Sequence, residues 1–427
     1  MRRYIDLLIP FVFLAFFFNS GAQVAINSPY TRFGLGEISQ QGFGISRGMG
    51  GTSIAHRFNN QINYLNPASY SAQDTLSFIL DFGVNGEIRE LRSQYEIVNL
   101  KDFNMEHIAI GFPITRFWGA SIGILPYSRI GYNMLLEGVF SSTEDIYRVY
   151  YEGNGSLNKF YIGSSVRLGK HLAIGTNLSY IFGSYERNKG VSLPRDASAE
   201  TMYINKTTIG DFMFNFGIQG FTKLKNGSEL KMGIVLDNST KLNGEFSSLL
   251  INNYALNIDT MERYENQEGN INIPVRFGAG FLYSYKNILL IAMDYSTQDW
   301  SKARFFGEAD SLIASSSIRF GLQYTPVSID EVRRAAYWKR ISLRAGGYYN
   351  KTYLDINGQQ LEDYGMTFGL GIPWKNERNL LTKTSFNISY QLGWQGSLDN
   401  GLVKETYHVF SVGFTLYDFW FIKPKYD

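Results

Sequence analysis

The stretch TSFNISYQLGWQG, residues 384–396, alternates two kinds of side chain without a break. The large apolar set is Phe386, Ile388, Tyr390, Leu392 and Trp394, and the residues between them are small or polar. A period of two places these sets on opposite faces of a β-strand. One face then suits lipid and the other suits water, which is the pattern of a strand in a transmembrane β-barrel.

The same alternation recurs along the chain from Leu76 onward. The fourteen candidate strands are residues 76–90, 103–114, 117–134, 156–168, 171–186, 207–223, 227–239, 272–285, 287–300, 312–325, 338–353, 362–374, 384–396 and 404–421. An even number of strands lets both ends of the barrel wall lie on the same side of the membrane. The sequence therefore predicts an all-β fold, a 14-stranded antiparallel transmembrane β-barrel over residues 76–421, followed by a short tail at 422–427.

The first 22 residues have the three parts of a secretory signal peptide. Arg2 and Arg3 are basic, residues 7–18 form an apolar run, and Ser20-Gly21-Ala22 supplies small residues for cleavage before Gln23. The alternative is a membrane anchor, but such a helix needs about 20 apolar residues. No later run is long enough to span as a helix, and only helices and closed barrels satisfy the backbone in lipid. We therefore expect export to the outer membrane of a Gram-negative bacterium.

The composition fits a barrel and narrows the function. Aromatic residues make up 16% of the chain, charged residues only 18%, and the net charge is +2. A nucleic-acid-binding protein would need a basic stripe, and none is present. Cysteine is absent and the four histidines are scattered, so we expect no metal and no cofactor. Tryptophans near strand ends, such as Trp118, Trp300 and Trp374, are typical of the aromatic girdles of such barrels.

Residues 23–75 do not alternate and are predicted to form a plug inside the barrel. A segment of this length without regular structure is usually functional. Tyr30, Phe33 and other apolar residues argue against the alternative, a disordered periplasmic tail. Glycine allows tight turns in a confined space. The plug residues singled out are Gly48, Gly50, Gly51, Asn66, Pro67 and Ala68.

These residues carry a resemblance to a known family. The segment GGTSIA at 50–55 followed by Asn66-Pro67-Ala68 resembles the N-terminal hatch of the FadL/TodX outer-membrane transporters of hydrophobic compounds. Residues 107–132, 157–186 and 342–371 resemble strands of that family, so the similarity touches most of the chain. The start of the chain, with Asn27-Ser28-Pro29-Tyr30, points to a divergent subgroup. The resemblance implies fourteen strands, a hatch in the lumen and a hydrophobic ligand captured by outer loops.

Two sets of residues are candidates for contacts. The charges on the inward register either line a path or pin the plug, and pinning is favoured because buried charges need partners; they are Asp81, Arg167, Asp211, Arg276, Arg319 and Arg344. The linkers 135–155, 187–206 and 240–269 are predicted to be long outer loops. The longest holds an apolar cluster that could receive a ligand, pack on the loop at 187–206 or meet a partner protein; it is Leu242, Phe246, Leu249, Leu250 and Ile251.

Three functions remain open from the sequence. The first is passive transport of hydrophobic molecules. The alternative is a non-enzymatic barrel subunit of a larger outer-membrane assembly, such as a secretion or barrel-assembly complex. An enzyme is disfavoured because no nucleophile, base and orienting group can be named together. Membrane lipid is the expected partner, a hydrophobic small molecule and other outer-membrane proteins are further candidates, and no nucleic acid is expected.

Overall fold

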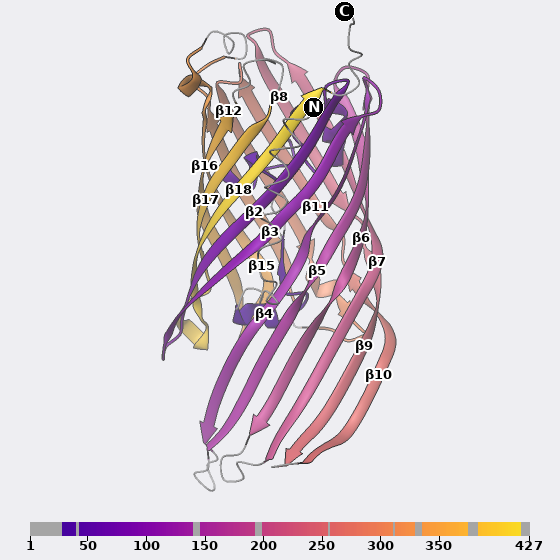
Figure 1. The fold of residues 1–427 in the computed structure, drawn as a ribbon, viewed down its shortest axis with the longest axis vertical. Helices are drawn as coiled ribbons and strands as arrows, with labels where there is room; N and C mark the ends of the chain where they lie inside the picture. The colour runs from indigo at the N-terminus through magenta and orange to yellow at the C-terminus, as the bar shows by residue number, and fades with distance from the viewer. Residues whose placement is uncertain are drawn as a thin grey trace, which may run out of the picture.

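The chain folds into a tall β-barrel with a segment inside it (Figure 1). This fold is seen in a computed structural model that describes residues 28–39, 42–139, 146–192, 199–254, 257–310, 312–328, 335–374 and 383–419. The predicted signal peptide at 1–22 and the tail at 422–427 lie outside the described residues. Among the described residues, no helix is both long and apolar enough to cross a membrane.

The barrel wall has fourteen antiparallel strands, as the alternation predicts. They are β2 (Ser77–Arg92), β3 (Ile97–Pro113), β4 (Trp118–Val139), β5 (Ile146–Leu168), β6 (Leu172–Ser192), β7 (Ala199–Lys223), β8 (Ser228–Asp237), β11 (Arg276–Tyr285), β12 (Leu289–Asp299), β14 (Ala314–Tyr324), β15 (Ser342–Ile356), β16 (Gln359–Pro373), β17 (Ser385–Gln395) and β18 (Lys404–Phe419). Pairing of β18 with β2 closes the barrel. Closure leaves no free edge along that seam.

The two faces of the wall follow the predicted register. On β17, Ile388 is 43% exposed on the outer face, whereas Asn387 and Gln391 are buried on the inner face. On β7, Phe214 and Phe216 are exposed outside, and Gln219 is buried inside. An apolar outer face and a polar inner face match a strand between lipid and an enclosed space.

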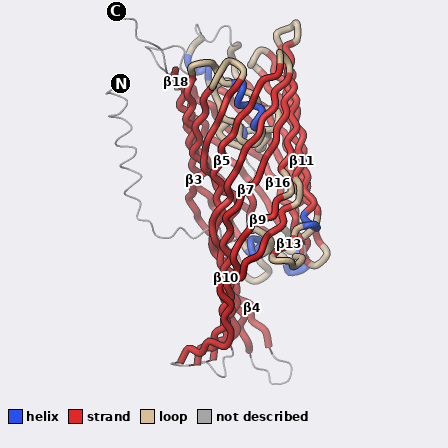
Figure 2. Tube along the Cα trace, turned by 90° about the vertical axis from the view of Figure 1, so that its right-hand side faces the viewer, coloured by secondary structure: helices blue, strands red, loops and turns tan. Residues whose placement is uncertain are grey.

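One side of the barrel extends well beyond the rest of the wall. This extension lies at the end of the barrel opposite to the start of β2 and the end of β18. We call that end the far end and the other the terminal end. There, β9 (Thr240–Tyr254) and β10 (Asn257–Ile273) pair with each other, and β9 extends the sheet from β7. They form a projecting sheet with the outer parts of β4–β7, comprising residues 128–139, 146–157, 183–192, 199–209, 244–254 and 257–269 (Figures 1 and 2).

The projecting sheet corrects the prediction of long outer loops. The described parts of 135–155, 187–206 and 240–269 are almost entirely strand. β-branched and aromatic residues, as in the run IYRVYY at 146–151, favour strands. Neighbouring hairpins here pair with one another, so a sheet forms even where the apolar–polar alternation is lost.

The plug lies in the lumen. Its elements are η1 (Pro29–Arg32), β1 (Glu37–Ile38), α2 (Ile45–Gly48) and η2 (Pro67–Ala72). η2 packs against β3–β7, and α2 packs against β15–β17 on the opposite side. The chain therefore crosses the enclosed space and touches the wall on several sides, as predicted for this N-terminal segment.

Strands β3 and β4 separate toward the far end (Figure 1). They share only six residue pairs, from Ile108/Ile124 to Pro113/Gly119, whereas β4 and β5 share 21. β1 pairs with β4 beyond this point, at Ser128 and Arg129. The plug therefore supplies backbone partners to part of β4 that β3 leaves open.

Candidate functional site

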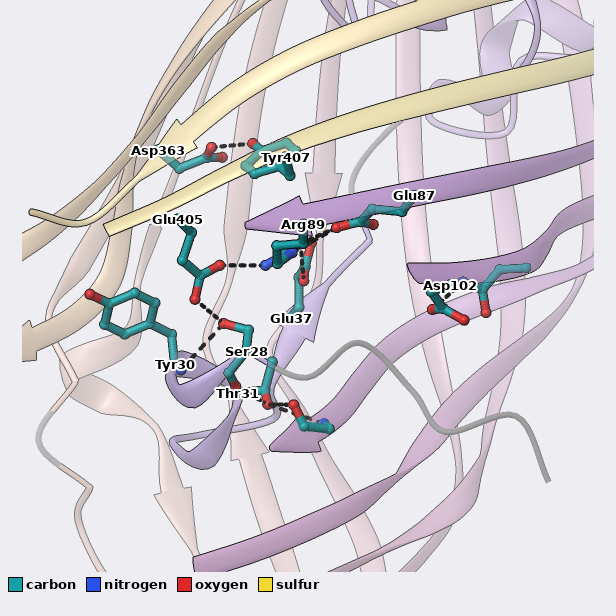
Figure 3. A network of polar contacts seen from close by, with 12 residues as sticks. Ser28, Tyr30, Thr31, Glu37, Glu87, Arg89, Asp102, Asp363, Glu405 and Tyr407 are labelled. Carbon is teal, nitrogen blue, oxygen red and sulfur yellow. Dashed lines mark hydrogen bonds and ion pairs between the residues drawn. The ribbon is translucent and has the colours of Figure 1, made fainter. Parts of the chain in front are cut away.

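A buried arginine on β2 joins the plug to the wall in the far half of the lumen (Figure 3). Arg89 lies 2.6 Å from Glu405 of β18, 2.7 Å from Glu87 and 3.2 Å from Glu37 of β1. Ser28 at the start of the plug donates to Glu405 at 2.6 Å. We call these five residues the Arg89 cluster. The guanidinium of Arg89 therefore faces three carboxylates in a structural ion-pair network. The stability of this network depends on its members, because buried charges are costly when unpaired.

The first turn of the plug is held by both side chain and backbone. Ser28 caps η1 by accepting from the Tyr30 backbone N–H at 3.3 Å. The Tyr30 hydroxyl donates to the Val403 carbonyl at 2.5 Å and accepts from its N–H at 3.1 Å. Burial, and then the nearby Glu405, raise the pKa of Tyr30. The phenol therefore stays a donor, and η1 is fixed between β18 and β4.

The glycine-rich part of the plug packs so closely against the opposite wall that the two backbones are in contact. Gly50 has a φ of +67° and donates to Thr367 Oγ1 at 2.7 Å. A Cβ atom there would lie 2.6 Å from the Gly347 carbonyl oxygen. Only glycine fits this left-handed conformation so close to another backbone. Gly48 likewise packs on Gly369.

Two further contacts fix the middle of the plug. Asp294 of β12 accepts the backbone N–H groups of Ser53 and Ile54, at 2.6 and 2.9 Å. Asn66 caps η2 by accepting from Ala68 N–H and donates to the Ile54 carbonyl at 2.7 Å. Pro67 at the first helical position needs no hydrogen-bond acceptor. The wall therefore fixes the plug at Ser53 and Ile54, and Asn66 ties two parts of the plug together.

An apolar cluster lies beside the Arg89 cluster in the far half of the lumen. Leu35 of the plug and Leu242 of β9 are fully buried there. The connection after β12, with η4 (Trp300–Lys302) and β13 (Arg304–Phe305), folds inward and brings Trp300 to within 4.9 Å of the Tyr353 ring. We call this cluster, with Tyr30, the far-end core. The interface-girdle prediction is wrong for Trp300, since an inward connection buries it.

Two cavities lie in the lumen, and both are small. The larger has a volume of about 220 Å³ and is lined by Glu37, Glu87, Arg89, Arg319 and Asp363 among others. The second, of about 40 Å³, lies beside Lys159 and Asp237. Sites for small organic ligands are typically about 300–1,000 Å³ and mostly apolar. Both cavities are smaller than such a site, and their walls mix polar with apolar residues.

Two of the six predicted lumen charges contact the plug, and a third contacts a wall residue that does. Arg319 donates to the Gly51 carbonyl at 3.3 Å, and Arg344 packs beside Gly48. Asp81 contacts His107 at 2.8 Å, and the His107 ring stacks on Phe43 of the plug at 3.6 Å. Pinning therefore fits these three residues better than lining a path.

The other three predicted charges have wall partners. Arg276 pairs with Asp237 on the neighbouring strand at 2.8 Å. Asp211 accepts the Asn243 N–H at 2.9 Å, where β8 gives way to β9. Arg167 is exposed at the terminal end and donates to the Arg116 carbonyl. Arg167 thus lies outside the enclosed lumen, because the inward register of β5 continues past the plug.

The predicted apolar cluster lies on a strand of the projecting sheet instead of a loop. Leu242 is buried in the far-end core, and Phe246 is half-buried with its ring 5.6 Å from Phe306. Leu249, Leu250 and Ile251 are half-buried farther along β9. Pairing with β10 on one side and β7 on the other places them within a sheet.

Sequence reasoning missed the Arg89 cluster and Asp294. Glu87 and Arg89 share the inward register of Asp81 on β2, so the alternation could have found them. Their partners Glu37 and Glu405 lie far away in sequence, and no local signal links them. Among the described residues, no group of three or more His, Asp or Glu side chains is arranged to hold a metal ion.

A family model described as BamG matches residues 2–427. The chain belongs to the BamG family. No curated protein matches it. Membership in the BamG family thus rests on nearly the whole chain.

Several solved barrels share the fold of this BamG-family chain. A FadL homologue of Pseudomonas aeruginosa is 10% identical, with a TM-score of 0.59, and the match covers 89% of this chain and 99% of that one. The P. putida toluene transporter TodX is 12% identical, with a TM-score of 0.59 and coverage of 90% and 100%. The CymD monoaromatic hydrocarbon channel is 14% identical, with a TM-score of 0.55 and coverage of 89% and 98%. The predicted outer-membrane barrel resembling FadL-type passive transporters of hydrophobic molecules is confirmed in its fold.

Proposed function

We propose that this protein is a non-enzymatic barrel subunit of a larger outer-membrane assembly in a Gram-negative bacterium, of the secretion or barrel-assembly kind. In this proposal the signal peptide at 1–22 is removed, the terminal end of the barrel faces the periplasm, and the projecting sheet faces the cell exterior. The barrel supplies a rigid wall in lipid, and the projecting sheet supplies contacts with neighbouring proteins.

The observation that carries the proposal is the packing of the far half of the lumen. Leu35, Leu242 and Trp300 are essentially inaccessible, so protein side chains occupy the region where a hydrophobic ligand would need an apolar space. The larger cavity beside them is lined by both signs of charge. A cavity of about 220 Å³ with charged residues in its wall offers a hydrocarbon little of the apolar burial that drives its binding.

The projecting sheet supports the same function. Tall strands on one side of a barrel add little to closure or to the lumen, yet they present a large surface beyond the membrane (Figure 2). Met261 and Tyr264 on β10 and Leu136 on β4 are exposed there. Exposed apolar side chains of this size on a sheet outside the barrel wall are suited to protein contacts.

Native mass spectrometry of the tagged protein, extracted from its own outer membrane in mild detergent, tests the proposal. We expect a particle heavier than one chain that contains other polypeptides in fixed ratio. The matched control is a tagged, unrelated outer-membrane barrel extracted in the same way. A particle consisting of one chain alone, before and after mild cross-linking, would refute the proposal. The same spectrum tests cleavage, because a chain starting at Gln23 has a distinct mass.

Passive transport of a hydrophobic molecule is the second candidate, favoured by the shared fold with a monoaromatic hydrocarbon channel and a toluene transporter. In that case Phe246 and Leu250 on the projecting sheet would receive the ligand. Replacing both with Asp should then abolish co-purification of lipid-like ligands, while the pair Phe214→Asp and Phe216→Asp on the outer face would impair membrane insertion instead. Absence of any bound ligand and normal uptake after gene deletion would exclude transport.

A further inference from the structure

One edge of the projecting sheet has open backbone hydrogen-bonding groups. β5 covers one side of β4 along its whole length. On the other side, β3 reaches only to Ile124, β1 pairs with Ser128 and Arg129, and the Ser28 N–H donates to the Gly131 carbonyl at 2.7 Å. Within the part of the chain that the structure describes, no strand pairs with this edge beyond Gly131.

The register identifies which groups are open. Gly131 points both its N–H and its C=O toward this edge, because the plug bonds to both. In an antiparallel sheet, alternate residues direct their backbone groups to the same side. The N–H and C=O groups of Asn133, Leu135, Glu137 and Val139 therefore point to the open edge. An edge strand of this kind is a template for a further strand.

The side chains around the edge are suited to a strand and not only to water. Leu135, Leu136 and Val139 are 51–60% exposed, and Leu135 and Leu136 lie on opposite faces of the sheet. The neighbouring Ile146 on β5 is exposed as well. Glu137, the charged residue of this segment, is paired with Arg148 at 2.7 Å. A strand with apolar residues on both faces would cover these side chains while it pairs with the backbone.

We propose that residues 133–139 of β4 bind an extended segment of another protein by antiparallel strand addition, continuing the ladder that β1 begins. This inference rests on the proposed function. The same strand of a second copy is the wrong occupant: in one membrane both copies run β4 in the same outward sense, so two β4 edges cannot form an antiparallel pair. The partner segment runs toward the membrane and carries apolar residues on both of its faces, a mode of recognition known as β-augmentation.

Backbone hydrogen exchange of the wild-type protein provides the first test. The amides of 132–139 are compared between the purified single barrel and the native particle, with residues 118–124 as an internal control because they are paired on both sides. We expect exchange in 132–139 to slow by about tenfold or more in the particle and to stay unchanged in 118–124. Equal exchange in both states would overturn the inference.

Proline substitution separates backbone pairing from side-chain contact. Leu135→Pro with Glu137→Pro removes two outward N–H groups, at positions where an edge strand tolerates proline. Leu135→Ala with Glu137→Ala removes the side chains and keeps those groups. We expect the first pair to lose the partner from the particle and the second pair to keep it. Both variant barrels should show the electrophoretic mobility of the folded wild type in unheated samples.

The outcomes distinguish this inference from the proposed function. If the proline pair still assembles, strand addition is refuted and the subunit function stands. If both pairs lose the partner, side chains dock it and strand addition is again refuted. If the wild type yields one chain alone, the subunit function fails and this inference fails with it. A particle of two copies of this chain would refute the choice of occupant.

Discussion

The lumen and the projecting sheet differ in whether their polar groups have hydrogen-bond partners. In the lumen, Arg89, Asp294 and Asn66 are buried, and each has at least one ion-pair or hydrogen-bond partner within the fold. On the projecting sheet, the outward backbone groups of 133–139 have no strand partner among the described residues. Buried polar groups must form their hydrogen bonds within the fold, whereas the backbone groups of an exposed edge strand are available to pair with another strand. The difference suggests that the inside of the barrel is structural and the outside is functional.

Arg89→Ala should have the largest effect on the lumen. Removing the guanidinium leaves Glu87 and Glu405 buried without a counter-charge, which typically costs about 3–5 kcal/mol. The measurement is denaturant unfolding of the barrel in detergent, with protease sensitivity of the plug as a second readout. Arg148→Ala breaks an exposed pair of the projecting sheet and should change the free energy of unfolding far less, because surface ion pairs contribute little. Equal effects of the two substitutions would remove the contrast between the regions.

Leu35→Ala tests whether the far-end core is a packed interior. Truncation of a fully buried leucine typically costs about 2–5 kcal/mol. Leu136→Ala, on the projecting sheet, should change stability by about 0.5 kcal/mol or less because the side chain is more than half exposed. Unfolding midpoints of the two variants give the comparison. A similar midpoint for Leu35→Ala and wild type would mean that the far half of the lumen is loosely filled.

Gly50→Ala isolates the close approach of plug and wall. A left-handed conformation costs an alanine about 1–2 kcal/mol, and the collision with the Gly347 backbone adds to it. Gly358→Ala is the matched control, because its φ is +78° but a Cβ there meets nothing within 4 Å. We expect Gly50→Ala to be the more destabilising by thermal unfolding. If the two cost the same, the plug does not press on the wall at Gly50.

His56→Gln should have the smallest effect, seen as a pH dependence. Burial, with Lys231 nearby, lowers the pKa of His56 to about 3. The unfolded chain therefore binds one more proton than the folded chain as the pH falls from about 6.5, and stability declines by at most about 1.4 kcal/mol per pH unit. The glutamine variant should lose this part of the slope of unfolding free energy against pH. An unchanged slope would mean that His56 is accessible to protons in the folded protein.

The alternation determines the wall but not its irregularities. Residues 384–396 predict β17 nearly to the residue, because each outward side chain is apolar and each inward one is small or polar. The pairing of β2 with β3 shifts register between Gly83 and Val84, so that both Glu106 and His107 of β3 point inward. There Glu106 forms an ion pair with Arg47 of the plug at 3.2 Å. A bulge breaks the period of two, so alternation assigns these two residues to opposite faces.

The partners of buried charges and the height of the strands also escape the sequence. Glu37 and Glu405 are 368 residues apart, and only closure of the barrel around the plug brings both to Arg89. The projecting sheet forms because hairpins pair with each other beyond the barrel. That pairing does not require the apolar–polar alternation from which the wall strands are predicted. The glycines and Asn66-Pro67-Ala68 of the plug were predictable in place, since turns and helix caps are local.

A density map of the particle extracted from native membranes tests the central claim most directly. The account predicts another protein against the projecting sheet, with a strand beside residues 133–139 of β4, and a far-end core formed by side chains of this chain, Leu35, Trp300 and Tyr353 among them, with no ligand. A solitary barrel with a hydrophobic molecule in place of that core would contradict it.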